Sequence, residues 1–200
     1  MNAIIAEKKF IAERTGIPYS NLSQSYLRAE TALSNLSQYE FQLQRNNVAN
    51  PIVTERLLEL NDEFVMTHLT IGLKLPAALT DAGHLAAEVY TYPDVTAGFA
   101  ASEEGIYNSS FSLTINRKEF LPEFPVRYFR RVPDTQEVTI AGAKNGYYNG
   151  LYGFAAFEPV KIDGRQTIQS LLSLGAGTTM TVNSFLVLEC RGYLVTNAKS

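Results

Sequence analysis

The chain has 200 residues, of which 46% are hydrophobic and 18% charged, and its formal net charge is -3 at pH 7. This length predicts one domain or one domain with an appendage, and this composition excludes disorder along the whole chain. The small negative charge lacks the basic excess that is typical of nucleic-acid-binding proteins. The single cysteine, Cys190, excludes an internal disulfide and gives no support for a structural zinc site.

Two further patterns concern location. About 18 consecutive apolar residues are needed for a helix to span a bilayer, and the sequence has no such run. The first 16 residues, MNAIIAEKKFIAERTG, do not follow the basic-then-apolar order of a signal peptide. We therefore expect the protein to be made and assembled in the cytoplasm of the producing cell, without a membrane span.

The N-terminal quarter predicts helices. Residues 1–14 fit an amphipathic helix with Ile4, Ile5, Phe10 and Ile11 toward one side, and the helix is expected to end at Gly16 and Pro18. A second helix is expected from about Ser20 to Arg45, because apolar residues recur at spacings of four, three, four and three, as in a coiled-coil seam. That seam packs either on its own domain or on a neighbouring subunit. The expected interface residues of this helical arm are Leu22, Tyr26, Ala29, Leu33 and Leu36.

The polar segment Asn46–Pro51 marks the predicted boundary between a helical arm, 1–50, and a β domain, 51–200. From Phe64 onward the pattern has the two-residue period of a strand, and one face is expected to hold Val65, Thr67, Leu69, Ile71, Leu73 and Leu75. Pro122 and Pro125 place their segment at a sheet edge or in a loop. A long loop is expected over 94–109, and turns at 163–164, 175–177 and Gly192. Strands are expected over 64–75, 86–92, 111–116, 126–132, 138–140, 151–157, 160–162, 167–174, 178–189 and 188–194.

Short apolar runs separated by glycine and proline turns at this spacing indicate an all-β sandwich or barrel. The strand 178–189 is apolar enough to require a second sheet over at least one of its faces. The predicted fold is therefore mainly β: a jelly-roll-like antiparallel β-sandwich with an N-terminal α-helical arm.

The sequence contains no catalytic motif. A nucleophile with a histidine base requires one of the two histidines, His68 in a strand or His84 in a loop, and neither has a motif around it. Cys190 is expected to be a small buried apolar residue. Glu103 and Glu104 lack the aspartate spacing of a calcium loop. We therefore expect no enzyme activity, no cofactor and no metal site.

Two clusters are candidates for recognition. Arg127, Arg130 and Arg131 alternate with aromatic residues, which fits pairing with carboxylates at a protein interface and also leaves contact with single-stranded nucleic acid open. Tyr147 and Tyr148, with Tyr152 nearby, are expected core or subunit-contact residues. They also keep open a second function, that of a β-sandwich module that binds carbohydrate or another ligand.

The C-terminal half resembles the closing strands of jelly-roll capsid proteins of bacterial viruses. The resemblance is carried by Pro159, the alternating residues 160–162, the turn Asp163–Gly164, the strands 167–174 and 188–194, and the segment 101–132. The strand 188–194 includes Arg191, Gly192 and Tyr193. The resemblance implies a virion structural protein that assembles with copies of itself and with other virion proteins, with the helical arm reaching a neighbour. In such proteins the interface itself is the functional surface.

Overall fold

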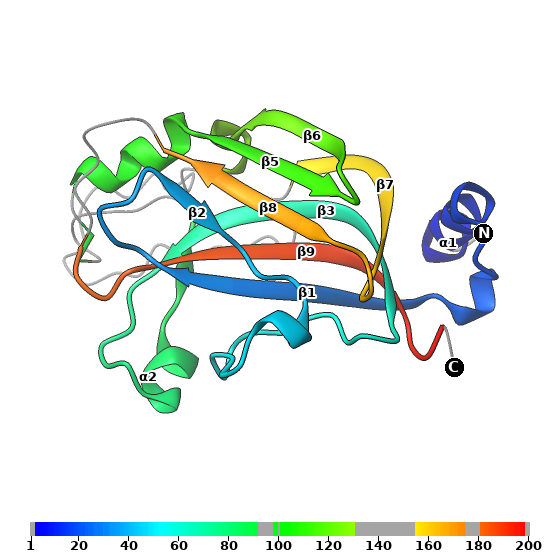
Figure 1. Ribbon diagram of the computed structural model, residues 1–200, viewed down its shortest axis with the longest axis horizontal. Coiled ribbons are helices and arrows are strands. Elements are labelled where there is room, and N and C mark those ends of the chain that lie inside the picture. Colours follow the sequence, from blue (N-terminus) through cyan, green and yellow to red (C-terminus); the bar gives the residue numbers. More distant parts are fainter. Residues whose placement is uncertain (1–2, 92–97, 100, 131–154, 175–180, 199–200) are drawn as a thin grey trace.

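The computed structural model describes residues 3–91, 98–99, 101–130, 155–174 and 181–198. Within these ranges two antiparallel sheets pack face to face (Figure 1). Sheet A contains β1 (Ser23–Ala32), β3 (Glu63–Lys74), β4 (Val89–Tyr90), β7 (Ala155–Asp163) and β9 (Phe185–Val195). Sheet B contains β2 (Gln38–Glu40), β5 (Ser110–Ile115), β6 (Lys118–Pro125) and β8 (Ile168–Ser173). The helices are α1 (Ala3–Thr15), α2 (Asp81–Ala86) and the short 3-10 turns η1 (Tyr19–Asn21), η2 (Arg45–Asn47), η4 (Ala101–Asn108) and η5 (Val126–Phe129).

The strand pairing is nested. Strand β1 pairs with β9, β2 with β8, β3 with β7, and β5 with β6, and all four pairs are antiparallel. Sheet A has the order β1-β9-β3 with β7 beside β3, and sheet B has the order β2-β8-β5-β6. One long hairpin that is folded over into two sheets has this pairing, which is the jelly-roll arrangement. The predicted fold class is confirmed.

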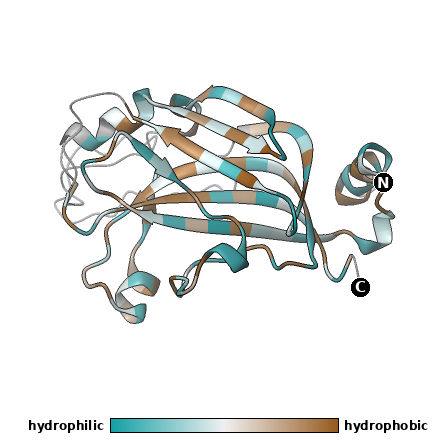
Figure 2. Cartoon of the chain, viewed as in Figure 1, coloured by the Kyte–Doolittle hydropathy of each residue, from teal (hydrophilic) through white to brown (hydrophobic). Residues whose placement is uncertain are grey.

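The core lies between the two sheets. Strand residues alternate between the core and solvent, and Figure 2 shows brown and teal alternating along the strands of sheet B. Phe41 and Phe111 meet in the core with ring centroids 6.4 Å apart, and Ile71 and Leu188 of sheet A are fully buried in the same cluster. Burial of this apolar surface is the main stabilising contribution to the sandwich.

Strand β3 confirms the prediction over 64–75 but changes face midway. A bulge lies between Met66 and His68, where the register with both β7 and β9 shifts. Phe64 and Met66 therefore face the core before the bulge, and Leu69 faces it after the bulge. The expected continuous face that starts at Val65 is wrong, because one extra residue in a strand reverses the alternation beyond it.

Strand β9 overturns the turn that was expected at Gly192. This glycine lies inside the strand opposite Met66. A Cβ atom at this position would lie 1.8 Å from the carbonyl oxygen of Val65. Gly192 is therefore needed for the close approach of two backbones, and the strand runs on to Val195.

Helix α1 confirms the expected first helix. It ends at Thr15 and is followed by Gly16, whose φ of +73° favours glycine. It lies beside one end of the sandwich in Figure 1. A second, small apolar cluster anchors it to the outer face of sheet A. This cluster contains Ile11, Ile17, Leu22, Val65, Tyr193 and Val195.

The helix that was expected over 20–45 is wrong. Strand β1 occupies residues 23–32 and pairs along its whole length with β9, and β2 follows at residues 38–40. Cross-strand pairing here overrides the heptad-like spacing, because β1 buries Leu27 and Ala29 toward the core. Both sheets therefore already include residues before the boundary predicted at residue 50.

Four smaller expectations change, and one is confirmed. Residues 126–129 form the 3-10 turn η5 and not a strand, and η4 lies within the expected loop over 94–109. His84 lies in α2, which ends at Ala86, so the strand expected over 86–92 is reduced to β4. Strand β6, which contains Pro122 and Pro125, is an edge strand of sheet B, as predicted. The turn expected at 175–177 and the strand expected over 138–140 lie outside the described residues.

Candidate functional site

Helix α1 presents apolar side chains to solvent. Ile4, Ile5 and Phe10 are 44%, 43% and 47% exposed, whereas Ile11 is fully buried against the sandwich. Arg14 connects the helix to the body through an ion pair with Glu158 at 3.2 Å. Because α1 buries one apolar side chain against the body and exposes others, it can also pack against a second protein surface. We use the name outer face of α1 for the exposed apolar set Ile4, Ile5 and Phe10, whose side chains leave the helix in different directions, about 100° or more apart.

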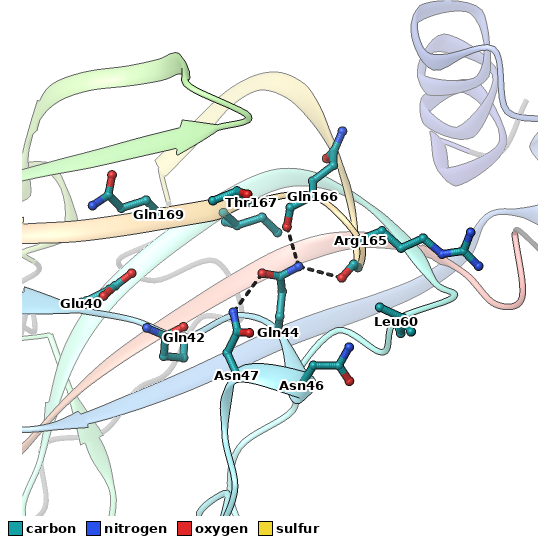
Figure 3. Close-up of a pocket in the computed structure, with 12 residues that line it drawn as sticks. Glu40, Gln42, Gln44, Asn46, Asn47, Leu60, Arg165, Gln166, Thr167 and Gln169 are labelled. Atoms are coloured by element: carbon teal, nitrogen blue, oxygen red, sulfur yellow. Dashed lines mark hydrogen bonds between the residues drawn. The ribbon is translucent and has the colours of Figure 1, made fainter.

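A groove of about 740 Å³ lies on the outer face of sheet B, next to the turn that joins β7 to β8 (Figure 3). Six of its lining residues carry side-chain amides. These residues are Gln42, Gln44, Asn46, Asn47, Gln166 and Gln169. Amides donate and accept hydrogen bonds in the same group, so the groove offers both functions along its length.

The floor of the groove follows from the alternation of two strands. Tyr39 and Phe41 point into the core, so Glu40 and Gln42 point outward from the same chain segment. The neighbouring strand buries Ile168 and exposes Gln169. The backbone amide of Phe41 donates to the carbonyl of Ser170 at 2.9 Å, which keeps the two segments in one ladder. Gln42, two residues beyond the end of β2, and Gln169 of β8 therefore lie next to each other on the same outer face.

Gln44 fixes the wall of the groove. Its Nε2 atom donates to the carbonyl oxygens of Gly164 and Gln166, at 2.7 Å each. Its Oε1 atom accepts from Nδ2 of Asn47 at 3.2 Å. Figure 3 shows these three hydrogen bonds converging on Gln44 at the centre of the site. This buried amide is therefore structural and holds the β7–β8 turn against η2.

The groove is close to neutral. Glu40 and Arg165 are its charged lining residues, they are opposite in sign, and both are exposed. Arg165 donates to Oδ1 of Asn61 at 2.6 Å. Neither an anion nor a cation therefore gains a net electrostatic attraction from these lining side chains.

A second polar cluster is buried where β1, β3 and the segment 52–55 meet. Lys74, which is 0% exposed, pairs its Nζ atom with Oε2 of Glu30 and donates to Oγ1 of Thr54 at 3.0 Å. Thr54 in turn donates to Oε1 of Glu30 at 2.6 Å, and Nε of Arg28 donates to the same oxygen at 2.9 Å. Glu55 accepts from the backbone amide of Glu30 at 2.9 Å. Each charge is compensated within the cluster, as a buried ion pair requires.

The pKa values in this cluster follow from burial and partners. Burial alone raises the pKa of Glu30, but hydrogen bonds from Lys74 and Thr54, with the charge of Arg28, hold it below its usual range. Burial lowers the pKa of Lys74 against the opposing effect of Glu30. Burial also lowers the pKa of His84, whose Nδ1 atom lies 3.9 Å from Oε2 of Glu30. Because these side chains are buried, the cluster offers no access to a substrate.

The residues considered for chemistry are placed apart. His68 lies on β3 with Nδ1 2.9 Å from Oγ1 of Thr67, and His84 contacts the ring of Phe185 edge-on at 5.0 Å. Burial raises the pKa of the Cys190 thiol, as expected for a small core residue. Among the described residues, no three acidic, histidine or cysteine side chains gather as metal ligands would. The helices within the same ranges are too short or too polar to cross a bilayer.

The predicted interface of the helical arm divides in two. Leu22, Ala29 and Leu33 are buried within the molecule, so they are not available to a neighbouring subunit. Tyr26 is partly exposed beneath the guanidinium of Arg56, 5.1 Å from its ring centroid, and Leu36 is 61% exposed. The exposed pair stays a prediction.

The predicted interface of the β domain is only partly described. Arg127 is exposed in η5, and Arg130 follows it with intermediate exposure. Arg131, Tyr147 and Tyr148, like Tyr152, lie outside the described residues.

The groove was missed because its two halves are distant in sequence. The bond from Gln44 to Gly164 joins residues that are 120 positions apart. The local signal was the alternation Tyr39, Phe41, Leu43 with polar residues between them, which indicates a strand with a polar outer face. The outer face of α1 was partly visible, because its isoleucines and Phe10 defined the expected helix.

Comparisons with protein-family models, with curated proteins and with solved structures find no match to this chain.

Proposed function

We propose that this protein is a virion structural subunit that assembles into, or attaches to, the shell of a bacterial virus. It acts through interfaces with copies of itself and with other virion proteins, and it is assembled in the host cytoplasm. The jelly-roll pairing of the strands supports this proposal, because viral capsid domains use this architecture, although lectin domains and cupins use it as well.

The observation that carries the proposal is the outer face of α1. Ile4, Ile5 and Phe10 each keep more than two fifths of their surface in contact with water. Full burial of one such side chain contributes about 2 kcal/mol, so covering the exposed part of all three contributes about 3 kcal/mol per subunit. Repeated around a symmetric shell, contacts of this size add up to a stable assembly.

The test compares the purified full-length chain with the double variant Ile5→Ser/Phe10→Ser. Light scattering after size exclusion and negative-stain electron microscopy measure assembly over a range of protein concentrations. The wild type is expected to form oligomers or particles, and the variant is expected to shift toward monomer with an unchanged melting temperature. The matched control is Leu79→Ser/Leu85→Ser, which removes two exposed leucines next to and within α2.

Two results would count against the proposal. One is a wild-type chain that stays monomeric at the highest concentration reached. The other is a double variant in α1 that assembles as well as both the wild type and the α2 control, since assembly would then not use the outer face of α1.

A further inference from the structure

We propose that the amide-lined groove on sheet B binds a neutral, hydroxyl-rich ligand of the oligosaccharide class. This site is separate from the outer face of α1, and the inference does not depend on assembly. It rests on the chemistry of the lining, on its fixed geometry and on what the groove excludes.

The available groups match hydroxyls. In the described part of the chain, the side-chain amides of Gln42, Asn46 and Gln169 have no hydrogen-bond partner. A sugar hydroxyl both donates and accepts, and a side-chain amide does the same through its NH₂ and its oxygen. Adjacent hydroxyls on a sugar ring can therefore bind one amide through two bonds, and outward amides on neighbouring strands repeat that opportunity.

The geometry is preorganised. Gln42 and Gln169 project from paired segments, since Ser170 donates through Oγ to the carbonyl of Phe41 at 2.6 Å. Gln44 is held by three hydrogen bonds, so the wall that carries Asn46 does not have to order when a ligand enters. Sites on rigid elements lose less conformational entropy on binding.

An extended peptide fits less well. A peptide that adds to a sheet needs a free strand edge, but the edge next to the groove is occupied. Leu58 donates to the carbonyl of Leu43 at 2.8 Å and accepts from the amide of Arg45 at 2.9 Å. Leu60 is the exposed apolar residue of the lining, which leaves no row of pockets for peptide side chains.

A phosphate-bearing ligand also fits less well. Binding a polyanion needs an excess of basic groups, whereas the groove pairs one arginine, Arg165, with one carboxylate, Glu40. Figure 3 places these two residues on opposite sides of the amides. The lining is thus suited to an uncharged polar ligand.

The experiment uses the full chain and three neutral probes, maltohexaose, cellohexaose and chitohexaose. Saturation-transfer NMR detects binding, and titration gives the dissociation constant, which is expected at about 1 mM or tighter for at least one probe. Gln42→Ala and Gln169→Ala are each expected to weaken binding about threefold to tenfold, the effect of one lost neutral hydrogen bond. Asn46→Ala, outside both strands, is a third variant in case either of the others unfolds, which the melting temperature reveals.

The matched control is Gln24→Ala, an exposed amide on β1 in the other sheet, and it is expected to bind like the wild type. Absence of binding to all three hexasaccharides at millimolar concentration would overturn the inference. So would wild-type affinity in all three groove variants. Salt-sensitive binding of heparin that is lost in Arg165→Gln would assign the groove to an anion and overturn it as well.

Discussion

Replacing Lys74 by methionine is expected to destabilise the sandwich by about 3 kcal/mol. Methionine keeps the length of the side chain and removes the ammonium group. Lys74 is fully buried near the end of β3, where its Nζ atom contacts both Glu30 and Thr54. The carboxylate of Glu30, whose side chain is also 0% exposed, then keeps its charge without its closest partner.

The expected cost of Lys74→Met follows from the contacts that Glu30 keeps in the variant. Breaking a buried ion pair by removing one member costs about 3–5 kcal/mol. Arg28 still contacts Oε1 of Glu30 at 2.8 Å, and Thr54 still donates to that oxygen, so the lower end of the range applies. The other oxygen, Oε2, is left with Nδ1 of His84 at 3.9 Å.

A double-mutant cycle isolates the charge effect. The pair Glu30→Gln and Lys74→Met removes both charges, and the Arg28 side chain, which is 17% exposed, can reach water. We expect the double variant to be more stable than the sum of the two single changes by about 2 kcal/mol. Urea unfolding at pH 7, followed by tyrosine fluorescence and circular dichroism, measures each free energy. A cost below about 1 kcal/mol for Lys74→Met, or no coupling, would refute the reasoning.

Gly192→Ala should destabilise the fold by about 3 kcal/mol, because the new Cβ atom would lie 1.8 Å from the carbonyl oxygen of Val65 on β3. Gly16→Ala should cost about 1 kcal/mol, because the added Cβ atom meets open space and only the positive φ is unfavourable. Equal melting temperatures of the two variants would contradict this. The folded pKa of His84 lies below its ordinary 6.5, so the unfolded state binds the proton first and stability is lost as pH falls from 6.5 through that lower value. His84→Gln should therefore flatten the pH profile of the melting temperature in this window. Glu103 is fully buried and accepts hydrogen bonds from the backbone amide and the hydroxyl of Thr181, both at 2.8 Å. Glu103→Gln should therefore lower the free energy of unfolding in urea by about 2 kcal/mol. A change below about 0.5 kcal/mol would be evidence against a stabilising contact between Glu103 and Thr181.

The sequence predicted those strands whose alternation of apolar and polar residues was regular, because such strands can be recognised without knowing their neighbours in the sheet. Strand β5 alternates Phe111, Leu113 and Ile115 inward with polar residues outward, and the structure has that pattern. Strand β3 was found from its apolar run, but its bulge was not, because Thr67 carries no local signal that one residue is extra. Register depends on the neighbouring strands, which lie far away in sequence.

The N-terminal strands were predicted as a helix because the spacing of their apolar residues fits a coiled-coil seam as well as a strand. Leu22, Ala29 and Leu33 fit a heptad seam, yet Ala29 and Leu33 are buried in the sandwich core and Leu22 in the small cluster under α1. The charges of Arg28 and Glu30 obscured the alternation of β1, since a buried charge looks like a solvent-facing one until its partner is known. That partner, Lys74, is 44 residues away from Glu30.

Nested pairing explains why the site was harder to predict than the fold. The first strand pairs with the last, so the contacts that build the groove and the buried cluster join distant segments. Gln42 and Gln169 are unremarkable polar residues in the sequence, and only the pairing of β2 with β8 places them together. Fold class depends on period and turns, whereas a site made of side chains depends on register.

The two apolar clusters make assembly and folding separable. The sandwich core contains no residue of α1, and the small cluster under the helix receives from it one buried side chain, Ile11, within the described residues. Substitutions at Ile5 and Phe10 therefore change what a neighbour meets and leave the core intact, whereas a polar residue at Ile11 would release the helix from the body. If assembly depends on the outer face alone, the Ile5 and Phe10 substitutions abolish it at constant stability. If it depends on the docked position of α1, Ile11→Ser abolishes it as well, since the outer face then loses its fixed orientation.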